Sequence, residues 1–133
     1  MTRPRVLIAD PDPDRLTAYR DYLVSDGFEV ATAGSALECL ERLREFAPDL
    51  LVLAPFLPWG GGDGVLARVS EDPRLPRVPV IVLSSVEDLA DAPRLWDFPI
   101  TEFHSQPVSP PLLARRIRLH LANRGSVNSP GGQ

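Results

Sequence analysis

The amino-acid sequence predicts an open α/β fold in which a parallel sheet carries helices on both faces. Short apolar runs of strand length alternate along the chain with amphipathic segments of helix length. The runs are almost entirely apolar, as is typical of strands in a parallel sheet that is buried on both sides. The four clearest runs are RVLIA at 5–9, FEVAT at 28–32, DLLVL at 49–53 and PVIVL at 79–83.

The length of the chain, 133 residues with 44% hydrophobic residues, suits one domain with one sizeable core. We expect this domain to span residues 1–123. The closing segment 124–133 is rich in Gly, Ser and Pro and is predicted to be a flexible tail or the start of a linker. Every apolar run is shorter than the ~20 residues that a membrane span needs, so we expect a cytoplasmic protein with no membrane partner.

The first two helices are predicted from their N-terminal signals. Asp12 is the expected N-cap of the first helix, with Pro13 at its first helical position. The second helix opens with a capping box from Ser35 to Glu38. It also contains the single cysteine, Cys39, which we expect to be a packed and inert thiol. The buried face of the first helix is predicted to consist of Leu16, Tyr19 and Leu23.

The second half of the chain has a less regular pattern. A short third helix is predicted to begin at Asp63. The segment 86–100 should hold a fourth helix, but Pro93 lies inside it, so we expect this helix to be short or broken in two. A fifth strand, TEFHS at 101–105, is polar enough for the edge of the sheet. The last helix is predicted to start at 109–111, with Leu113, Ile117 and Leu121 on its buried face.

The balance of charge limits the classes of partner. The chain has 18 acidic and 14 basic residues, a net charge of −4, which disfavours general attraction to nucleic acid. Every basic residue is Arg, and the sequence contains no Lys. Arg115 and Arg118 lie opposite the apolar stripe of the last helix. This Arg stripe is a candidate surface for a protein partner or, as an alternative, a contact to nucleic-acid phosphates.

In an open α/β sheet the functional site lies at the carboxyl ends of the strands. The first strand ends in DPDPD at 10–14, the third at Ala54, the fourth at Ser84 and the fifth in SQP at 105–107. An acidic turn after the first strand repels phosphate. A nucleotide-binding or flavin-binding site, which needs a Gly-rich or hydroxyl-rich loop at a helix N-terminus, therefore fits poorly.

Several landmarks together resemble the receiver domain of bacterial two-component response regulators. VLIADPDPDRL, PDLLVLAPFLP, the DG pair at 63–64, PVIVLSS and FHSQP occur in the order and spacing of that family, over roughly residues 4–123. The resemblance implies a flavodoxin-like, CheY-like fold of five βα units with a parallel sheet of strand order 2-1-3-4-5. It also implies a cis peptide bond between Gln106 and Pro107.

The resemblance further implies a phosphorylation pocket, of which this chain keeps only part. Receivers accept a phosphoryl group on an Asp at the end of the third strand, hold Mg²⁺ with two further acidic residues, and bind the phosphoryl oxygens with a Lys and a hydroxyl. The first acidic residue and the hydroxyl are matched here by Asp10 and Ser84. The second acidic residue is replaced by Pro11, the acceptor by Ala54 and the Lys by Gln106.

These replacements remove the chemistry of the pocket. A methyl group cannot attack phosphorus, and one carboxylate is too little charge to hold Mg²⁺. We therefore expect a degenerate pseudo-receiver that is not an enzyme, uses no metal or other cofactor, and acts through protein–protein interaction in a two-component-type pathway. The alternative is a phosphorylated receiver with a relocated acceptor, for which Asp12 and Asp63 are the candidates.

The expected partner surface comprises the fourth helix, the fifth strand and the fifth helix, and it is also the candidate interface of a homodimer. Its candidate contact residues are Trp96, Phe103, Arg115 and Arg118. Phe103 is either a fixed aromatic of the edge strand or a switch residue. The glycine-rich loop after the third strand is expected to place Trp59 near the mouth of the pocket, as a lid or as a binding anchor.

Overall fold

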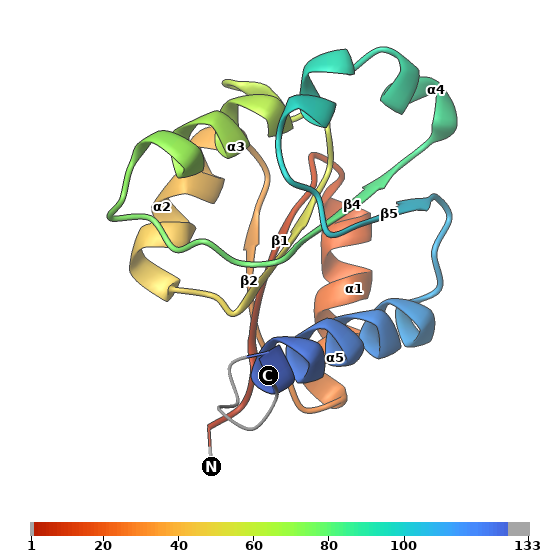
Figure 1. Ribbon diagram of the computed structural model, residues 1–133. Helices are drawn as coiled ribbons and strands as arrows, with labels where there is room; N and C mark the ends of the chain where they lie inside the picture. The colour runs from red at the N-terminus through yellow and green to blue at the C-terminus, as the bar shows by residue number, and fades with distance from the viewer. Residues whose placement is uncertain (1, 128–133) are drawn as a thin grey trace.

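In a computed structural model that describes residues 2–127, the chain forms a five-stranded parallel sheet between two layers of helices (Figure 1). The strand order is β2-β1-β3-β4-β5, so the predicted flavodoxin-like, CheY-like fold is confirmed. Each strand lies within one residue of its predicted bounds, and the polar fifth strand is at an edge of the sheet, as expected. The strands are β1 (Arg5–Ala9), β2 (Glu29–Ala33), β3 (Leu50–Leu53), β4 (Val80–Ser84) and β5 (Glu102–Ser105).

The two faces of the sheet support two separate clusters of buried side chains. Val6 and Ile8 of β1 face helices α1 (Pro13–Ser25) and α5 (Pro110–Val127), where Leu23, Leu113 and Ile117 are fully buried. Leu7 and Ala9 face α2 (Ala36–Phe46) and α3 (Gly61–Glu71). Because adjacent side chains of a strand point to opposite faces, the apolar run of β1 supplies both clusters.

The predicted caps of the first two helices are present. The side chain of Asp12 accepts hydrogen bonds from the backbone N–H groups of Asp14 and Arg15. Ser35 caps α2 by accepting the N–H of Glu38 at 3.1 Å. Cys39 is fully buried in α2, and burial raises the pKa of its thiol to about 12, which agrees with the inert role predicted for it.

Helix α3 differs from the prediction. It is as long as α2 and begins at Gly61, two residues before the expected start, so Asp63 lies in its first turn and is not its cap. Gly60 and Gly61 have positive φ angles of 131° and 76°. These conformations let the chain turn back at once, and the N–H of Gly62 donates to the carbonyl of Pro55 at 2.8 Å.

The fourth helix is broken, as predicted. A short α4 (Val86–Ala90) is followed by a 3₁₀ turn, η1 (Pro93–Asp97), that begins at the proline. Helix α5 continues to Val127, past the predicted boundary of the domain at residue 123, and the remainder of the expected tail, 128–133, lies outside the described residues. None of the helices within residues 2–127 is long and apolar enough to cross a membrane.

Candidate functional site

The residues predicted to share a site are brought together at the carboxyl ends of the strands. The N–H of Ala54 donates to the carbonyl of Ala9 at 2.9 Å, which places the end of β3 beside Asp10. The N–H of Gln106 donates to the carbonyl of Ser84 at 2.9 Å. The peptide bond between Gln106 and Pro107 is cis, as predicted.

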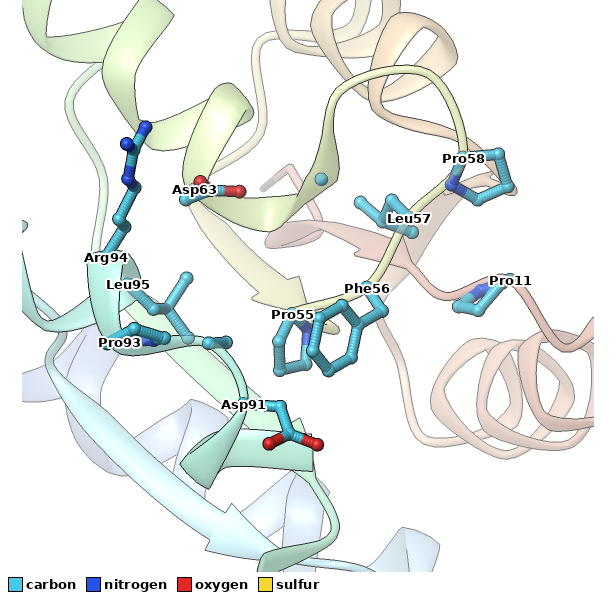
Figure 2. Close-up of a pocket in the computed structure, with 12 residues that line it drawn as sticks. Pro11, Pro55, Phe56, Leu57, Pro58, Asp63, Asp91, Pro93, Arg94 and Leu95 are labelled. Atoms are coloured by element: carbon cyan, nitrogen blue, oxygen red, sulfur yellow. The ribbon is translucent and has the colours of Figure 1, made fainter. Parts of the chain in front are cut away.

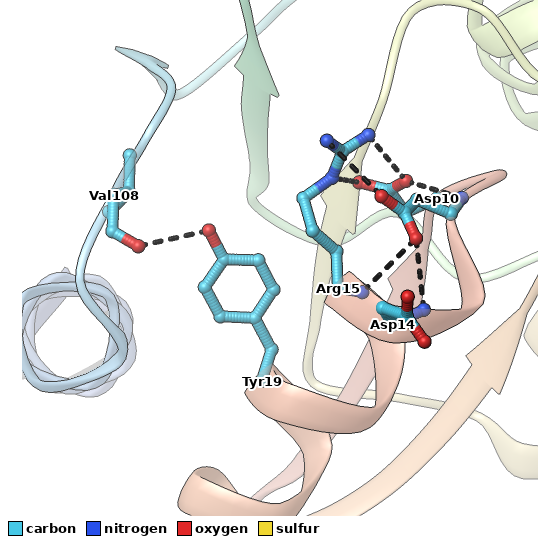
Figure 3. A network of polar contacts seen from close by, with 6 residues as sticks. Asp10, Asp14, Arg15, Tyr19 and Val108 are labelled. Carbon is cyan, nitrogen blue, oxygen red and sulfur yellow. Dashed lines mark hydrogen bonds and ion pairs between the residues drawn. The ribbon is translucent and has the colours of Figure 1, made fainter.

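The carboxylate of Asp10 is held by an arginine from the first turn of α1 (Figure 3). Asp10 is only 3% exposed, and its two oxygens accept hydrogen bonds from Nε of Arg15 at 3.0 Å and from a terminal nitrogen of the same guanidinium at 3.1 Å. The backbone N–H of Asp12 supplies a further bond at 2.8 Å. A two-point contact of this kind is the strongest form of an arginine–carboxylate pair. The hydrogen bonds to Asp10 raise the pKa of Arg15 above its ordinary value.

Arg15 was not among the residues that the sequence pointed to. The cation that the family resemblance implies is a Lys, and the chain has none. A signal was nevertheless present, because Arg15 is the third residue after the cap Asp12. Side chains in the first turn of a helix lean back toward the N-terminus, which here is the end of β1. The negative charge of Asp10 is therefore compensated by Arg15 of the same chain, in addition to the loss of the other acidic groups of the pocket.

A second contact connects α1 to the segment after β5. The hydroxyl of Tyr19, which is 5% exposed, donates to the carbonyl of Val108 at 3.0 Å (Figure 3). Burial is the main cause that raises the pKa of Tyr19, so the phenol stays neutral. The Arg15 and Tyr19 side chains, one turn apart, thus join the ends of β1 and β5 through one helix.

The remaining groups of the site are uncharged, and Ala54 and Ser84 are also buried. Ala54 is 7% exposed and ends in a methyl group. Ser84 is 2% exposed, and its hydroxyl has no hydrogen-bond partner among the described residues. Pro11 is exposed at the rim and offers no side-chain oxygen. No nucleophile therefore stands at the end of β3.

Mg²⁺ does not fit this set of donors. The cation prefers carboxylate oxygens, and the only carboxylate among the five predicted site residues is Asp10, whose oxygens are taken by Arg15. Within the described part of the chain, no three His, Cys, Asp or Glu side chains are grouped so that they could hold a metal ion.

The sequence matches the response regulator receiver domain over residues 6–118. The chain belongs to this family. Receiver domains are signalling modules of two-component systems, and this receiver has the all-parallel sheet and strand order of its structural neighbours.

The similar proteins differ in how much of their own length aligns with this chain. It is 27% identical to the polar-differentiation response regulator DivK of Brucella ovis, and the alignment covers 89% of this chain and 96% of that protein. It is 28% identical to a probable cyclic di-GMP phosphodiesterase of Vibrio cholerae, with 91% of this chain but only 27% of the relative covered. A CheY-like receiver from Methanospirillum hungatei shares the fold, with a TM-score of 0.81, 22% identity, and coverage of 96% of this chain and all of that one.

The four candidate contact residues of the predicted partner surface differ in their surroundings. The rings of Trp96 and Phe103 meet edge to face, with centroids 6.3 Å apart, and Trp96 is 55% exposed. Arg118, in contrast, reaches Asp26 beyond the end of α1 and lies over the ring of Phe28. Its guanidinium is thus paired within the molecule while half of the side chain stays exposed, and its place on the partner surface stays a prediction. Arg115 remains exposed on α5.

A cluster between β5 and α5 was also missed. Glu102 accepts hydrogen bonds from Arg116, His104 and His120, and its side chain is 16% exposed. Arg116 is the first cause that lowers the pKa of Glu102 well below its ordinary range. Arg116 and His120 are 14 and 18 positions from Glu102 and share no recognisable sequence pattern with it. His104, only two positions away, lies on the same strand.

The glycine-rich loop after β3 leaves the side chain of Trp59 largely exposed to solvent. Its side chain is 81% exposed, and its φ angle is 63°. Both roles predicted for Trp59, a lid and a binding anchor, stay predictions. A backbone that turns sharply at Trp59 and Gly60 directs the indole outward.

Proposed function

We propose that this receiver is a protein-interaction module that works without being phosphorylated, in a two-component-type pathway in the cytoplasm. The observation that carries the proposal is Ala54, a buried methyl group at the end of β3 where the family resemblance implies the acceptor carboxylate. A methyl group has no electron pair with which to attack phosphorus. The receiver fold is retained while this chemistry is lost, which is what an interaction domain without catalytic activity requires.

The state of Asp10 supports the same proposal. A receiver that binds Mg²⁺ needs a free cluster of carboxylates, but here the one retained carboxylate is paired with Arg15 at 3.0 Å. The absence of the Lys is consistent with this pairing, since the guanidinium of Arg15 already compensates the negative charge of Asp10. We infer that the pocket is a closed structural element that needs neither metal nor another cofactor.

The alternative of a relocated acceptor is weakened by local geometry at one of its two candidates. Asp12 accepts N–H groups as the cap of α1 and lies 3.6 Å from a nitrogen of Arg15, so its oxygens are occupied. Asp63 lies in the first turn of α3 with no hydrogen bond or ion pair among the described residues. Asp63 is therefore the candidate acceptor that a phosphorylation experiment must check.

The partner surface that we propose is centred on the ring pair of Trp96 and Phe103. Aromatic side chains with an exposed edge are typical anchors of protein interfaces, and Trp96 lies in the short η1 turn beside β5. A homodimer through α4, β5 and α5 would use the same rings. Contact to nucleic acid through the Arg stripe is disfavoured because Arg118 already pairs with Asp26 and the chain has a net charge of −4.

The decisive experiment is intact-mass spectrometry after incubation with acetyl phosphate and Mg²⁺. We expect no adduct on the wild-type protein and little on Ala54→Asp. The triple variant Pro11→Asp, Ala54→Asp, Gln106→Lys should be phosphorylated measurably, because it restores the nucleophile, the second metal ligand and the cation together. Adding Arg15→Ala to the triple variant should increase the yield further by releasing Asp10 for the metal.

The matched comparison is Ala54→Asp against the triple variant, since both contain the same nucleophile. A stoichiometric, hydroxylamine-labile adduct on the wild-type protein would show that the proposal is wrong. Peptide mapping of that adduct to Asp63 or Asp12 would establish the relocated acceptor instead.

A further inference from the structure

A groove of about 610 Å³ opens between the loop that follows β3 and the η1 turn (Figure 2). It lies next to the degenerate phosphorylation pocket, but neither Asp10 nor Ala54 lines it. Four prolines from three segments of the chain form much of its wall, with the half-exposed ring of Phe56 among them. These prolines are Pro11, Pro55, Pro58 and Pro93. Because proline has little conformational freedom to lose, a wall of this composition is largely formed before a ligand arrives.

Three charged side chains without internal partners line the same groove. They are Asp63, Asp91 and Arg94, and none takes part in a hydrogen bond or ion pair of its side chain within the described residues. Asp63 is partly buried in the first turn of α3, where the helix dipole stabilises a carboxylate. Two carboxylates against one guanidinium give the groove an excess of negative charge.

These observations select the chemistry of an occupant. The apolar wall favours a large apolar side chain, and the unpaired carboxylates favour a cation beside it. Phosphate groups and nucleic acid are disfavoured by the same carboxylates. The volume lies within the range of roughly 300–1,000 Å³ that is usual for ligand sites. The apolar wall continues into the exposed loop around Phe56, so a peptide would contact more of it than a small molecule would.

We propose that this groove binds a peptide segment of a partner protein in which a large apolar side chain adjoins an arginine or a lysine. The apolar side chain packs against Phe56 and the prolines, and the cation pairs with Asp63. The inference rests on the proposed function, since it names the ligand of an interaction module. It also gives Pro11 a role, because a proline in place of an acidic residue adds to the apolar wall.

The test is a titration of the ¹⁵N-labelled full chain with two end-blocked octapeptides, one of alternating leucine and arginine and one of alternating leucine and glutamate. We expect saturable shifts of the backbone amides of Phe56, Gly61 and Leu95 with the leucine–arginine peptide. Asp63→Asn should weaken binding by at least about threefold, the loss of one partly exposed ion pair.

The apolar contribution has a matched control. Phe56→Ala should weaken binding of the leucine–arginine peptide, whereas Leu37→Ala should leave it unchanged, because Leu37 is 61% exposed on α2 and does not line the groove. Both side chains are at least 46% exposed, so neither change removes a core contact.

Three outcomes would overturn the inference. They are the absence of saturable shifts up to about 1 mM peptide, shifts confined to α5, and equal affinity for the leucine–glutamate peptide. Intact-mass spectrometry after incubation with acetyl phosphate distinguishes failure of the groove proposal from failure of the proposed function. An unphosphorylated wild type that does not bind the peptide refutes the groove alone, whereas a phosphorylated wild type refutes the interaction module without phosphorylation.

Discussion

The contact between Asp10 and Arg15 makes Arg15→Ala an informative perturbation. In the wild type, the buried carboxylate has three donors, of which two belong to the guanidinium and one to the N–H of Asp12. The alanine variant keeps only the N–H of Asp12. A carboxylate that is 3% exposed then carries a charge without a counter-charge in contact with it.

The expected cost follows from the burial of the two partners. Removing one partner of a fully buried ion pair costs about 3–5 kcal/mol. The side chain of Arg15 is 43% exposed, so water already screens part of the pair, and we reduce the expected loss for Arg15→Ala to about 2 kcal/mol. Asp10→Asn leaves Arg15 free to turn into water and should cost less, about 1 kcal/mol.

The assay is urea unfolding at pH 7, followed by circular dichroism, for the wild type, both single variants and the double variant. We expect the double variant to be more stable than the sum of the single changes predicts, by about 1 kcal/mol, because it contains no unpaired carboxylate. Arg20→Ala is the control, since Arg20 pairs only with its exposed neighbour on α1, and it should change stability by less than about 0.5 kcal/mol. If Arg15→Ala behaves like Arg20→Ala, or if the single changes simply add, the reasoning about this pair is refuted.

The other two predictions concern the ends of β5 and β3. Arg116 lowers the pKa of Glu102, so the stability that the carboxylate contributes is fully present above the pKa of an unfolded glutamate, about 4.3, and is lost as the pH falls further. The difference in unfolding free energy between the wild type and Glu102→Gln should therefore be larger at pH 7 than at pH 3, and an unchanged difference would contradict the assignment. Gly62→Ala should destabilise the protein by about 2 kcal/mol, because its Cβ would stand 2.7 Å from the carbonyl oxygen at the end of β3. Gly64→Ala in the same helix has no atom within 4 Å of the new Cβ and should stabilise by about 0.5 kcal/mol, and thermal unfolding of the two variants compares them directly.

The sequence determined the architecture of this receiver and most of its site. Hydrophobic periodicity records which face of each element is buried, so the strands and the buried faces of α1 and α5 could be read from it. The break in the fourth helix could be read from Pro93, since proline disrupts a helix interior. Ala54, Pro11 and Gln106 could be located because the ends of parallel strands meet at one edge of a sheet. The early start of α3 was missed because three glycines carry no side-chain pattern, and the close approach of Gly62 to the end of β3 is a tertiary contact.

Only the tertiary structure decided how the remaining charges are used. Arg15 and Arg118 are both exposed positions in a helical pattern, yet one holds the buried carboxylate of the site and the other pairs with Asp26 at the end of the neighbouring helix α1. The direction of a long, flexible side chain depends on which acceptor the fold brings within about 3 Å of it, and periodicity carries no information about that distance. For the same reason the sequence could place Asp63 at the start of a helix, while its unpaired carboxylate in a proline-lined groove became visible only in the folded chain.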